Sequence, residues 1–294
     1  MWMETTLVTK ESSLEDVAAL FGDYVGYGMV EEERNGLMAL TFFAPLEEGE
    51  DLWLAKENWI SSVAMKLKEA GFLDILVETK LLEDDSWNSS WKEYVKTMEI
   101  IPGLYVEPKW EEGETPEGAD SIIIDTESSF GTGNHETTQC CAKLIALHGK
   151  EAKHVLDIGT GTGILLFVVE HVLQGEGEFV GIDLDAKAVA QAIQNGEYNY
   201  SKAVFFEGDL DAAYEGVADL IIANLTGNPL KILLPTIIKK LSSHGILIIS
   251  GIVEDRLSEI LPYIHADYQI VETMKKKNWY TFALRKKHET SICK

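Results

Sequence analysis

Four polar residues, Asp157, Asp183, Asp209 and Asn224, stand at or just beyond the ends of short apolar runs in the second half of the chain. The runs alternate with segments of helical character, so they are predicted to be strands of a mainly parallel sheet, whose carboxyl ends meet at one edge. Carboxylate and amide side chains at such an edge can hydrogen-bond a polar ligand. The spacing therefore predicts a single ligand site there.

A glycine loop, Gly159-Thr160-Gly161-Thr162-Gly163, directly follows the first of these runs. A helix is predicted over Ile164–Leu173 and a second strand over Phe179–Ile182, which closes on Asp183. The glycines allow the backbone to pass close to a ligand without a Cβ in the way, and the helix N-terminus adds unpaired N–H groups. Asp183 can then accept hydrogen bonds from both hydroxyls of a ribose.

The glycine spacing bears on the identity of the ligand. A dinucleotide-binding loop has the pattern G-x-G-x-x-G, whereas here Gly163 arrives one residue early and Asp157 stands just ahead of the loop. An acid in that place disfavours a pyrophosphate and suits a cationic ligand. S-adenosylmethionine fits, with its adenosine at Asp183, its adenine amino group at Asp209, and its amino-acid and sulfonium end near Asp157 and Gly159. A tight turn with a buried acid and no ligand is the alternative.

A second polar loop, Thr126–Thr138, carries two glycines and a histidine and runs into a helix predicted to continue through Leu147. His135 is a candidate proton acceptor, although a satisfied structural histidine gives the same pattern. Thr138 is a candidate ligand contact, although Thr137 and Thr138 could equally cap the helix.

The chain is predicted to have three segments. Residues 1–80 have the order strand, helix, strand, strand, helix, strand of a ferredoxin-like α+β sandwich, with strands at 2–8, 25–30, 37–43 and 72–77 and helices from Leu14 and over 52–70. Residues 81–100 are predicted as a linker, with a helix at 81–95. Residues 101–294 alternate strand and helix as in a doubly wound α/β sheet, with an antiparallel pair closing it. Further helices are predicted to end at Leu241 and to span Val253–His265.

The formal net charge of −24 argues against nucleic acid and anionic membranes; it is compatible with a basic partner and equally with solubility alone or a salt-tolerant host. No apolar run is long enough to span a membrane and the N-terminus has no signal-peptide pattern, so a cytoplasmic protein is expected. Three cysteines at this spacing predict neither a disulfide framework nor a metal site, and Cys140 and Cys141 are interpreted as helix-packing residues.

Three motifs together resemble one family, PrmA, the methyltransferase of the eleventh large-subunit ribosomal protein. The family patterns F-G-T-G-x-H-x-T-T, D-x-G-x-G-x-G-I-L and A-N-I-L-A-G-P-L are matched by Phe130–Thr138, Asp157–Leu165 and Ala223–Leu230. The segment Leu82–Trp87 with Trp91 is also similar to the family, so the likeness covers nearly the whole chain. The resemblance implies a class I methyltransferase (Rossmann-like) domain behind a small ferredoxin-like domain that presents a basic ribosomal protein.

Carried over by position, the resemblance implies contacts with S-adenosylmethionine and a loop over its methionine end. The cofactor-binding residues expected on these combined grounds are Phe130, Thr138, Asp157, Gly159, Gly161, Gly163, Asp183, Asp209 and Asn224, and no metal is expected. The chain departs from the family at Glu136, which replaces a proline, at Glu127-Ser128, which replaces Pro-Gly, and at Gly227-Asn228, which replaces Ala-Gly. These changes face the acceptor more than the donor.

Methyl transfer to an amine requires a neutral lone pair aligned behind the methyl group. Holding a lysine neutral at pH 7 costs about 4.6 kcal/mol from its pKa of ~10.4. The Asn224 side-chain oxygen and the Leu225 carbonyl are expected to accept the amine hydrogens, with His135 or water taking the proton. The alternatives are a methyltransferase for another protein or a small molecule, an inactive cofactor-binding scaffold and, least favoured, a dehydrogenase. The expected oligomeric state is a monomer.

Overall fold

The structure, a computed structural model, forms two compact units, Met1–Lys96 and Thr97–Lys294. The residues that it describes are 2–10, 13–21, 29–34, 36–45, 52–82, 96–111, 113–125, 133–212, 214–225 and 227–287. The division between the units falls inside the segment 81–100 that was expected to be a linker. Leu81 and Leu82 lie in a strand, and the rest of the predicted linker helix, to Val95, lies outside the described residues.

The first unit has one four-stranded antiparallel sheet of order β2-β3-β1-β4. Its elements are β1 (Trp2–Thr9), α1 (Leu14–Leu20), β2 (Met29–Arg34), β3 (Leu37–Pro45), α2 (Leu52–Glu69) and β4 (Leu76–Leu82). Apolar side chains of the two helices pack on β1 and β3, and the Trp59 indole N–H of α2 donates to the Thr5 hydroxyl of β1 at 2.8 Å. Of the strand predicted at 25–30, residues 25–28 lie outside the described residues.

The last strand of this unit begins later than expected. A strand was predicted from Phe72, but β4 begins at Leu76. The reason is the end of α2, where Gly71 has a φ of 88° and the Phe72 N–H donates to the Leu67 carbonyl at 2.9 Å. These contacts form a Schellman cap, so Phe72 belongs to the helix end rather than to the sheet.

The second unit contains a three-stranded sheet, β5-β6-β7, and a seven-stranded sheet, β10-β9-β8-β11-β12-β14-β13. The elements before the glycine loop are β5 (Met98–Ile101), β6 (Leu104–Pro108), β7 (Asp120–Ile124), α4 (Glu136–His148) and β8 (His154–Ile158). Those after it are α5 (Ile164–Val172), β9 (Glu178–Asp183), α6 (Ala186–Tyr198), β10 (Val204–Glu207), β11 (Ala218–Asn224), α7 (Gly227–Ile237), β12 (Leu241–Val253), α8 (Leu257–Asp267), β13 (Tyr268–Lys276) and β14 (Trp279–Lys286).

Five strands of the large sheet, from β10 to β12, are parallel, and β14 and β13 add an antiparallel pair at one side. The predicted doubly wound sheet with a closing antiparallel pair is confirmed in this unit. Strand order reverses at β8, which has β9 on one side and β11 on the other. Ligands of open α/β sheets bind at such a switch point, beyond the carboxyl ends of the strands.

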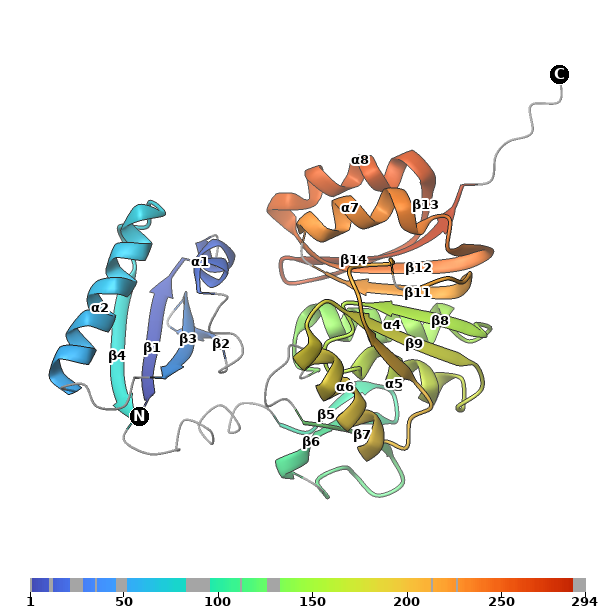
Figure 1. Cartoon of the computed structure of the whole chain (residues 1–294), viewed down its shortest axis with the longest axis horizontal. Helices are drawn as coiled ribbons and strands as arrows, with labels where there is room; N and C mark the ends of the chain where they lie inside the picture. The colour runs from blue at the N-terminus through green and yellow to red at the C-terminus, as the bar shows by residue number, and fades with distance from the viewer. Residues whose placement is uncertain are drawn as a thin grey trace. The chain divides into compact units, whose positions relative to one another are not determined.

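Helices cover both faces of the large sheet (Figure 1). The two faces have separate cores. One core contains apolar side chains of α4, α5 and α6, with Cys141 among them, and the other contains those of α7 and α8. Successive side chains of β8 point to opposite faces of the sheet. Val155 therefore belongs to the first core, and Leu156 and Ile158 belong to the second. Asp157 therefore faces the side of α4, α5 and α6.

Two helix boundaries differ from the prediction. The helix expected to reach Leu241 ends at Ile237, and Leu241 begins β12 because it pairs with Ala218 of β11. The helix expected from Val253 begins at Leu257, because Val253 still pairs with Trp279 of β14. None of the helices that the structure describes is long and apolar enough to cross a membrane.

Candidate functional site

The carboxyl ends of β10, β9, β8, β11 and β12 lie along one edge of the large sheet. The strand register aligns Glu207 with Asp183 and Ile158 with Ile182 on one side. On the other side it aligns Ile158 with Ala223, so that Gly159 and Asn224 are the next residues along each strand. The predicted site residues on these strands are thus brought to one edge.

Asp157 is fully buried beneath the glycine loop, with 1% of its surface exposed. Its Oδ2 accepts a hydrogen bond from the Thr160 hydroxyl at 2.8 Å, whereas its Oδ1 has no hydrogen-bond partner within the described structure. Burial raises the pKa of Asp157 to about 7, opposed by the Thr160 bond and assisted by the charge of Asp183. A buried oxygen without a partner is costly, so this carboxyl is suited to a donor that the chain itself does not supply.

The glycine loop is tied to the tip of β9 by backbone hydrogen bonds. The N–H groups of Gly159 and Thr160 both donate to the Ile182 carbonyl, at 2.8 and 3.1 Å. The Gly161 N–H donates to Asp183 Oδ2 at 2.9 Å, and Oδ1 of the same carboxylate accepts from the Asp185 N–H at 3.1 Å. Each carboxylate oxygen retains a further lone pair, so Asp183 can anchor the loop and still accept hydrogen bonds from a ligand.

Gly159 is the point at which the loop meets the β11 segment. Its φ of 71° lies in the left-handed region, and a Cβ at this position would stand 2.3 Å from Leu225 Cδ2. The Leu225 N–H in turn donates to the carbonyl of Ser250, the β12 residue that pairs with Asn224, at 3.2 Å. Asn224 and Leu225 are therefore fixed between the glycine loop and β12, with both side chains partly exposed.

His135 is the N-cap of α4. Its Nδ1 accepts from the Thr137 N–H at 3.3 Å and lies 2.7 Å from the Thr137 hydroxyl. The ring contacts the Trp279 ring edge-on, with centroids 4.9 Å apart. Burial lowers the pKa of His135, the charge of Glu136 opposes this and that of Lys277 adds to it. A neutral imidazole at pH 7 is the form that can accept a proton.

The loop before α4 approaches the start of α5. Gly133, with a φ of 85°, is closely packed, because a Cβ there would lie 3.1 Å from Ile164 Cδ1 and 3.2 Å from Val106. The end of the second polar loop thus lies beside the helix that the glycine loop begins. Thr138 is buried in the first turn of α4, and Phe130 lies outside the described residues.

Asp209 lies close to Asp183, because the residue before it, Gly208, donates its N–H to the Asp183 carbonyl at 2.8 Å. The Asp209 side chain is exposed. Sequence reasoning overlooked Leu184, an apolar side chain 69% exposed at the tip of β9. An apolar residue between Asp183 and Asp185, directly after a predicted strand, was the signal in the sequence that could have identified it. The contact of Trp279 with His135 had no local signal, because the two residues are far apart in the chain.

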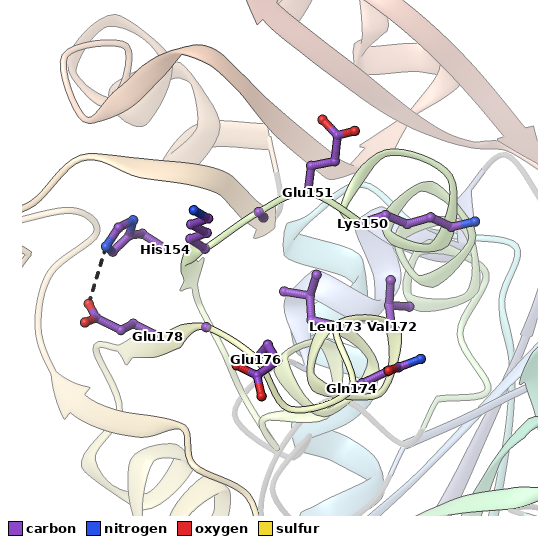
Figure 2. Close-up of a pocket in the computed structure, with 11 residues that line it drawn as sticks. Lys150, Glu151, His154, Val172, Leu173, Gln174, Glu176 and Glu178 are labelled. Carbon is purple, nitrogen blue, oxygen red and sulfur yellow. Dashed lines mark ion pairs between the residues drawn. The ribbon is translucent and has the colours of Figure 1, made fainter.

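Two surface cavities lie away from these residues. The larger, about 900 Å³, is at the amino ends of β8 and β9, between residues 150–154 and 172–178 (Figure 2). It contains ordinary exposed charges such as the His154–Glu178 pair at 3.7 Å, which Figure 2 marks. No cluster of metal-binding side chains occurs among the described residues.

The second unit is a methyltransferase-type α/β unit, with a glycine loop and an acid at the next strand tip at the switch point of its mixed sheet. The family model described as "Ribosomal protein L11 methyltransferase (PrmA)" matches residues 1–287, and the chain belongs to this family.

Relatives of this description match over almost their whole length. The ribosomal protein L11 methyltransferase of Caldanaerobacter subterraneus subsp. tengcongensis is 29% identical over 97% of this chain and 99% of its own. That of Dictyoglomus turgidum is 31% identical over 90% of this chain and 85% of its own. A crystal structure of a ribosomal protein L11 methylase from Lactobacillus delbrueckii subsp. bulgaricus, 27% identical, has a TM-score of 0.60 and covers 66% of this chain and 100% of its own. The resemblance noted from the sequence motifs is confirmed.

Proposed function

We propose that the chain transfers methyl groups from S-adenosylmethionine to amines of a basic ribosomal protein, large-subunit protein L11, in the cytoplasm. Membership of the methyltransferase family supports the reaction class, and the names of the relatives support the substrate. The observation that carries the donor assignment is the unpartnered, fully buried Oδ1 of Asp157 beneath the glycine loop.

The residues at the carboxyl edge fit this donor. Asp157 suits the positively charged amino-acid end, because pairing with a cation offsets the cost of a buried carboxylate. Asp183 would bind the ribose with the lone pairs that the Gly161 and Asp185 amides leave free, and Asp209 would bind the adenine amino group. Leu184 would cover the adenine face, Gly163 and Thr138 would border the site, and Phe130 would lie over the methionine end.

The acceptor residues stand on the neighbouring strand. When bound, S-adenosylmethionine supplies a methyl group already activated by its sulfonium, so placement of the amine dominates the chemistry. Asn224 Oδ1 and the Leu225 carbonyl would accept the two amine hydrogens and direct the lone pair. The proton that the attacking amine releases would pass to water or to His135, which burial keeps neutral and whose Nδ1 would first have to give up the Thr137 N–H.

The first unit is proposed to be a ferredoxin-like domain that presents the protein substrate. Its order of elements, with two helices packed on an antiparallel sheet of order β2-β3-β1-β4, supports this assignment. Segments 81–100 and 101–294 are proposed as linker and catalytic domain, and the protein as a monomer.

The test is incubation of the purified chain with the donor and recombinant L11, followed by mass spectrometry of L11. We expect mass increases in steps of one methyl group. Unmodified L11 with methylation of another protein in a ribosomal extract would support the diverged methyltransferase. Absence of any methylated product, together with measurable donor binding in a titration, would support the inactive scaffold.

A further inference from the structure

The edge strand β10 has features of a binding surface that the donor and acceptor residues do not explain. It is the outermost strand of the large sheet, with β9 as its single neighbour among the described strands. A terminal strand presents backbone N–H and C=O groups that have no partner in their own sheet. Natural edges are protected by short strands, charged side chains or proline; β10 is four residues long and reads Val-Phe-Phe-Glu, so its only charged residue stands at its end.

Both sides of this edge expose apolar surface. The side chains of Val204 and Phe206 are 50% and 46% exposed. They lie on the face of the sheet that α7 and α8 cover, because the residues that pair with them, Val180 and Ile182, belong to the core on that face. Phe205 points to the opposite face and lines a groove of about 580 Å³ between α6 and β10. Ile193 and Tyr200 form the outer wall of that groove and are 47% and 95% exposed.

Acidic side chains flank β10 and the groove beside it. Glu197, which lines the groove, and Glu207, at the end of β10, are exposed. The lysine within residues 193–207, Lys202, donates a hydrogen bond from its ammonium to the Gly175 carbonyl at 2.9 Å. A second copy of this chain would bring the same acids to the contact and be repelled.

We infer that β10 and the groove beside it bind an extended, basic segment of the protein substrate by adding it as a further strand. In this binding mode main-chain hydrogen bonds hold the peptide and pockets on the two faces select alternate side chains. Apolar side chains of the segment enter the groove lined by Ile193, Tyr200 and Phe205, and its lysines or arginines meet Glu197 and Glu207. The inference rests on the proposed function, because it assigns a surface to that substrate.

The test compares Ile193→Lys with Ile232→Lys in the full chain. Both isoleucines are exposed on helices, at 47% and 65%, but Ile232 lies on α7, which packs on the other face. We expect Ile193→Lys to raise the KM for L11 about fivefold or more while kcat and the donor Kd stay as in the wild type. Ile232→Lys should change none of the three. Equal KM values in the two variants would overturn the inference while wild-type turnover upheld the proposed function.

A binding measurement separates the inference from turnover. The probe is a peptide of roughly ten alternating valines and lysines, added to the full chain during hydrogen exchange. We expect slower exchange of the amides of residues 204–207 in the wild type and in Ile232→Lys, but not in Ile193→Lys. Unchanged exchange in the wild type would overturn the inference, as would a concentration-dependent dimer that Ile193→Lys abolishes, because the edge would then bind a second copy.

Discussion

The amino ends and the carboxyl ends of the parallel strands in the seven-stranded sheet form two edges. These differ in whether an aspartate there finds hydrogen-bond partners within the chain. The amino edge has the larger cavity, about 900 Å³, but Asp219 beside it accepts hydrogen bonds from the Lys153 and His154 amides at 3.1 and 3.2 Å. Although burial opposes it, these bonds hold the pKa of Asp219 below its usual value. At the carboxyl edge Asp157 is buried with one oxygen unpartnered and a pKa of about 7. The acid beside the cavity thus has its hydrogen bonds satisfied by the described part of the chain, whereas the acid beneath the glycine loop does not.

The largest expected effect is on the acceptor side of the carboxyl edge. Asn224→Ala removes the side-chain oxygen that is proposed to orient the amine, and kcat should fall about 100-fold or more, as for the loss of one oriented polar group at a reacting centre. The Kd of the donor, from calorimetry, should change far less. Equal turnover in variant and wild type would reject the role of Asn224.

Asp183→Ala and Asp219→Ala test the two edges with matched residues, since each carboxylate accepts two backbone N–H groups. Bonds to a charged group contribute about 1.5–3 kcal/mol each, so loss of the ribose bonds in Asp183→Ala should weaken donor binding about 100-fold. Asp219→Ala should lower the free energy of unfolding and leave donor binding unchanged. Equal donor affinities in the two variants would contradict the proposal that the donor binds at the carboxyl ends of the strands rather than at the amino ends.

Ionisation of Asp157 should make two quantities depend on pH in opposite directions. These are the free energy of unfolding of the donor-free chain and the affinity of the folded chain for the donor. Without it, the folded chain keeps this proton to about pH 7, whereas the unfolded chain releases it near pH 4. The folded state binds more protons in that window, so this group's contribution to the free energy of unfolding falls by a few kcal/mol as the pH rises from about 4 to 7. Urea titrations at several pH values should show this decrease in the free energy of unfolding for the wild type but not for Asp157→Asn.

Donor binding should follow the opposite trend, because a cationic ligand prefers the ionised carboxylate. The affinity should rise between pH 5.5 and 7.5, values chosen to span the pKa of about 7, and Asp157→Asn should bind weakly at both. A pH-independent Kd in the wild type would show that the donor does not contact this carboxyl.

The smallest expected effects concern His135, whose pKa is set by burial and by two opposite charges. Lys277 Nζ lies 2.7 Å from Glu136 Oε1, beside the imidazole. Glu136→Gln should lower the pKa of His135 further and Lys277→Gln should raise it, as followed by NMR titration of the ring. Shifts in the same direction would mean that the variants act through a change in structure rather than through charge.

Much of the second unit could be predicted because local patterns agree with its tertiary structure. Val155, Leu156 and Ile158 form a buried strand, and the positive φ angles of Gly159, Gly161 and Gly163 explain why the loop is glycine-rich. The placement of Asp157, Asp183 and Asn224 near one another was predictable, because parallel strands bring their carboxyl ends to one edge of the sheet.

The remaining features depend on contacts between distant residues. Leu241 continues an apolar helical pattern in the sequence, yet its pairing with Ala218 makes it the start of β12. The Thr160–Asp157 bond and the unpartnered Oδ1 require knowledge of burial as well as of spacing. The contact of the β13–β14 hairpin with His135, through Trp279, joins segments that no short motif connects.

The closeness of Gly159 to Leu225 has a consequence for how this protein could evolve or be engineered. The Leu225 side chain occupies the space in which any side chain on Gly159 would have to fit. A substitution at position 159 would push on Leu225, which is proposed to orient the amine, as well as distort the turn that is proposed to face the donor. Selectivity for the donor and selectivity for the amine therefore cannot be altered separately through this position.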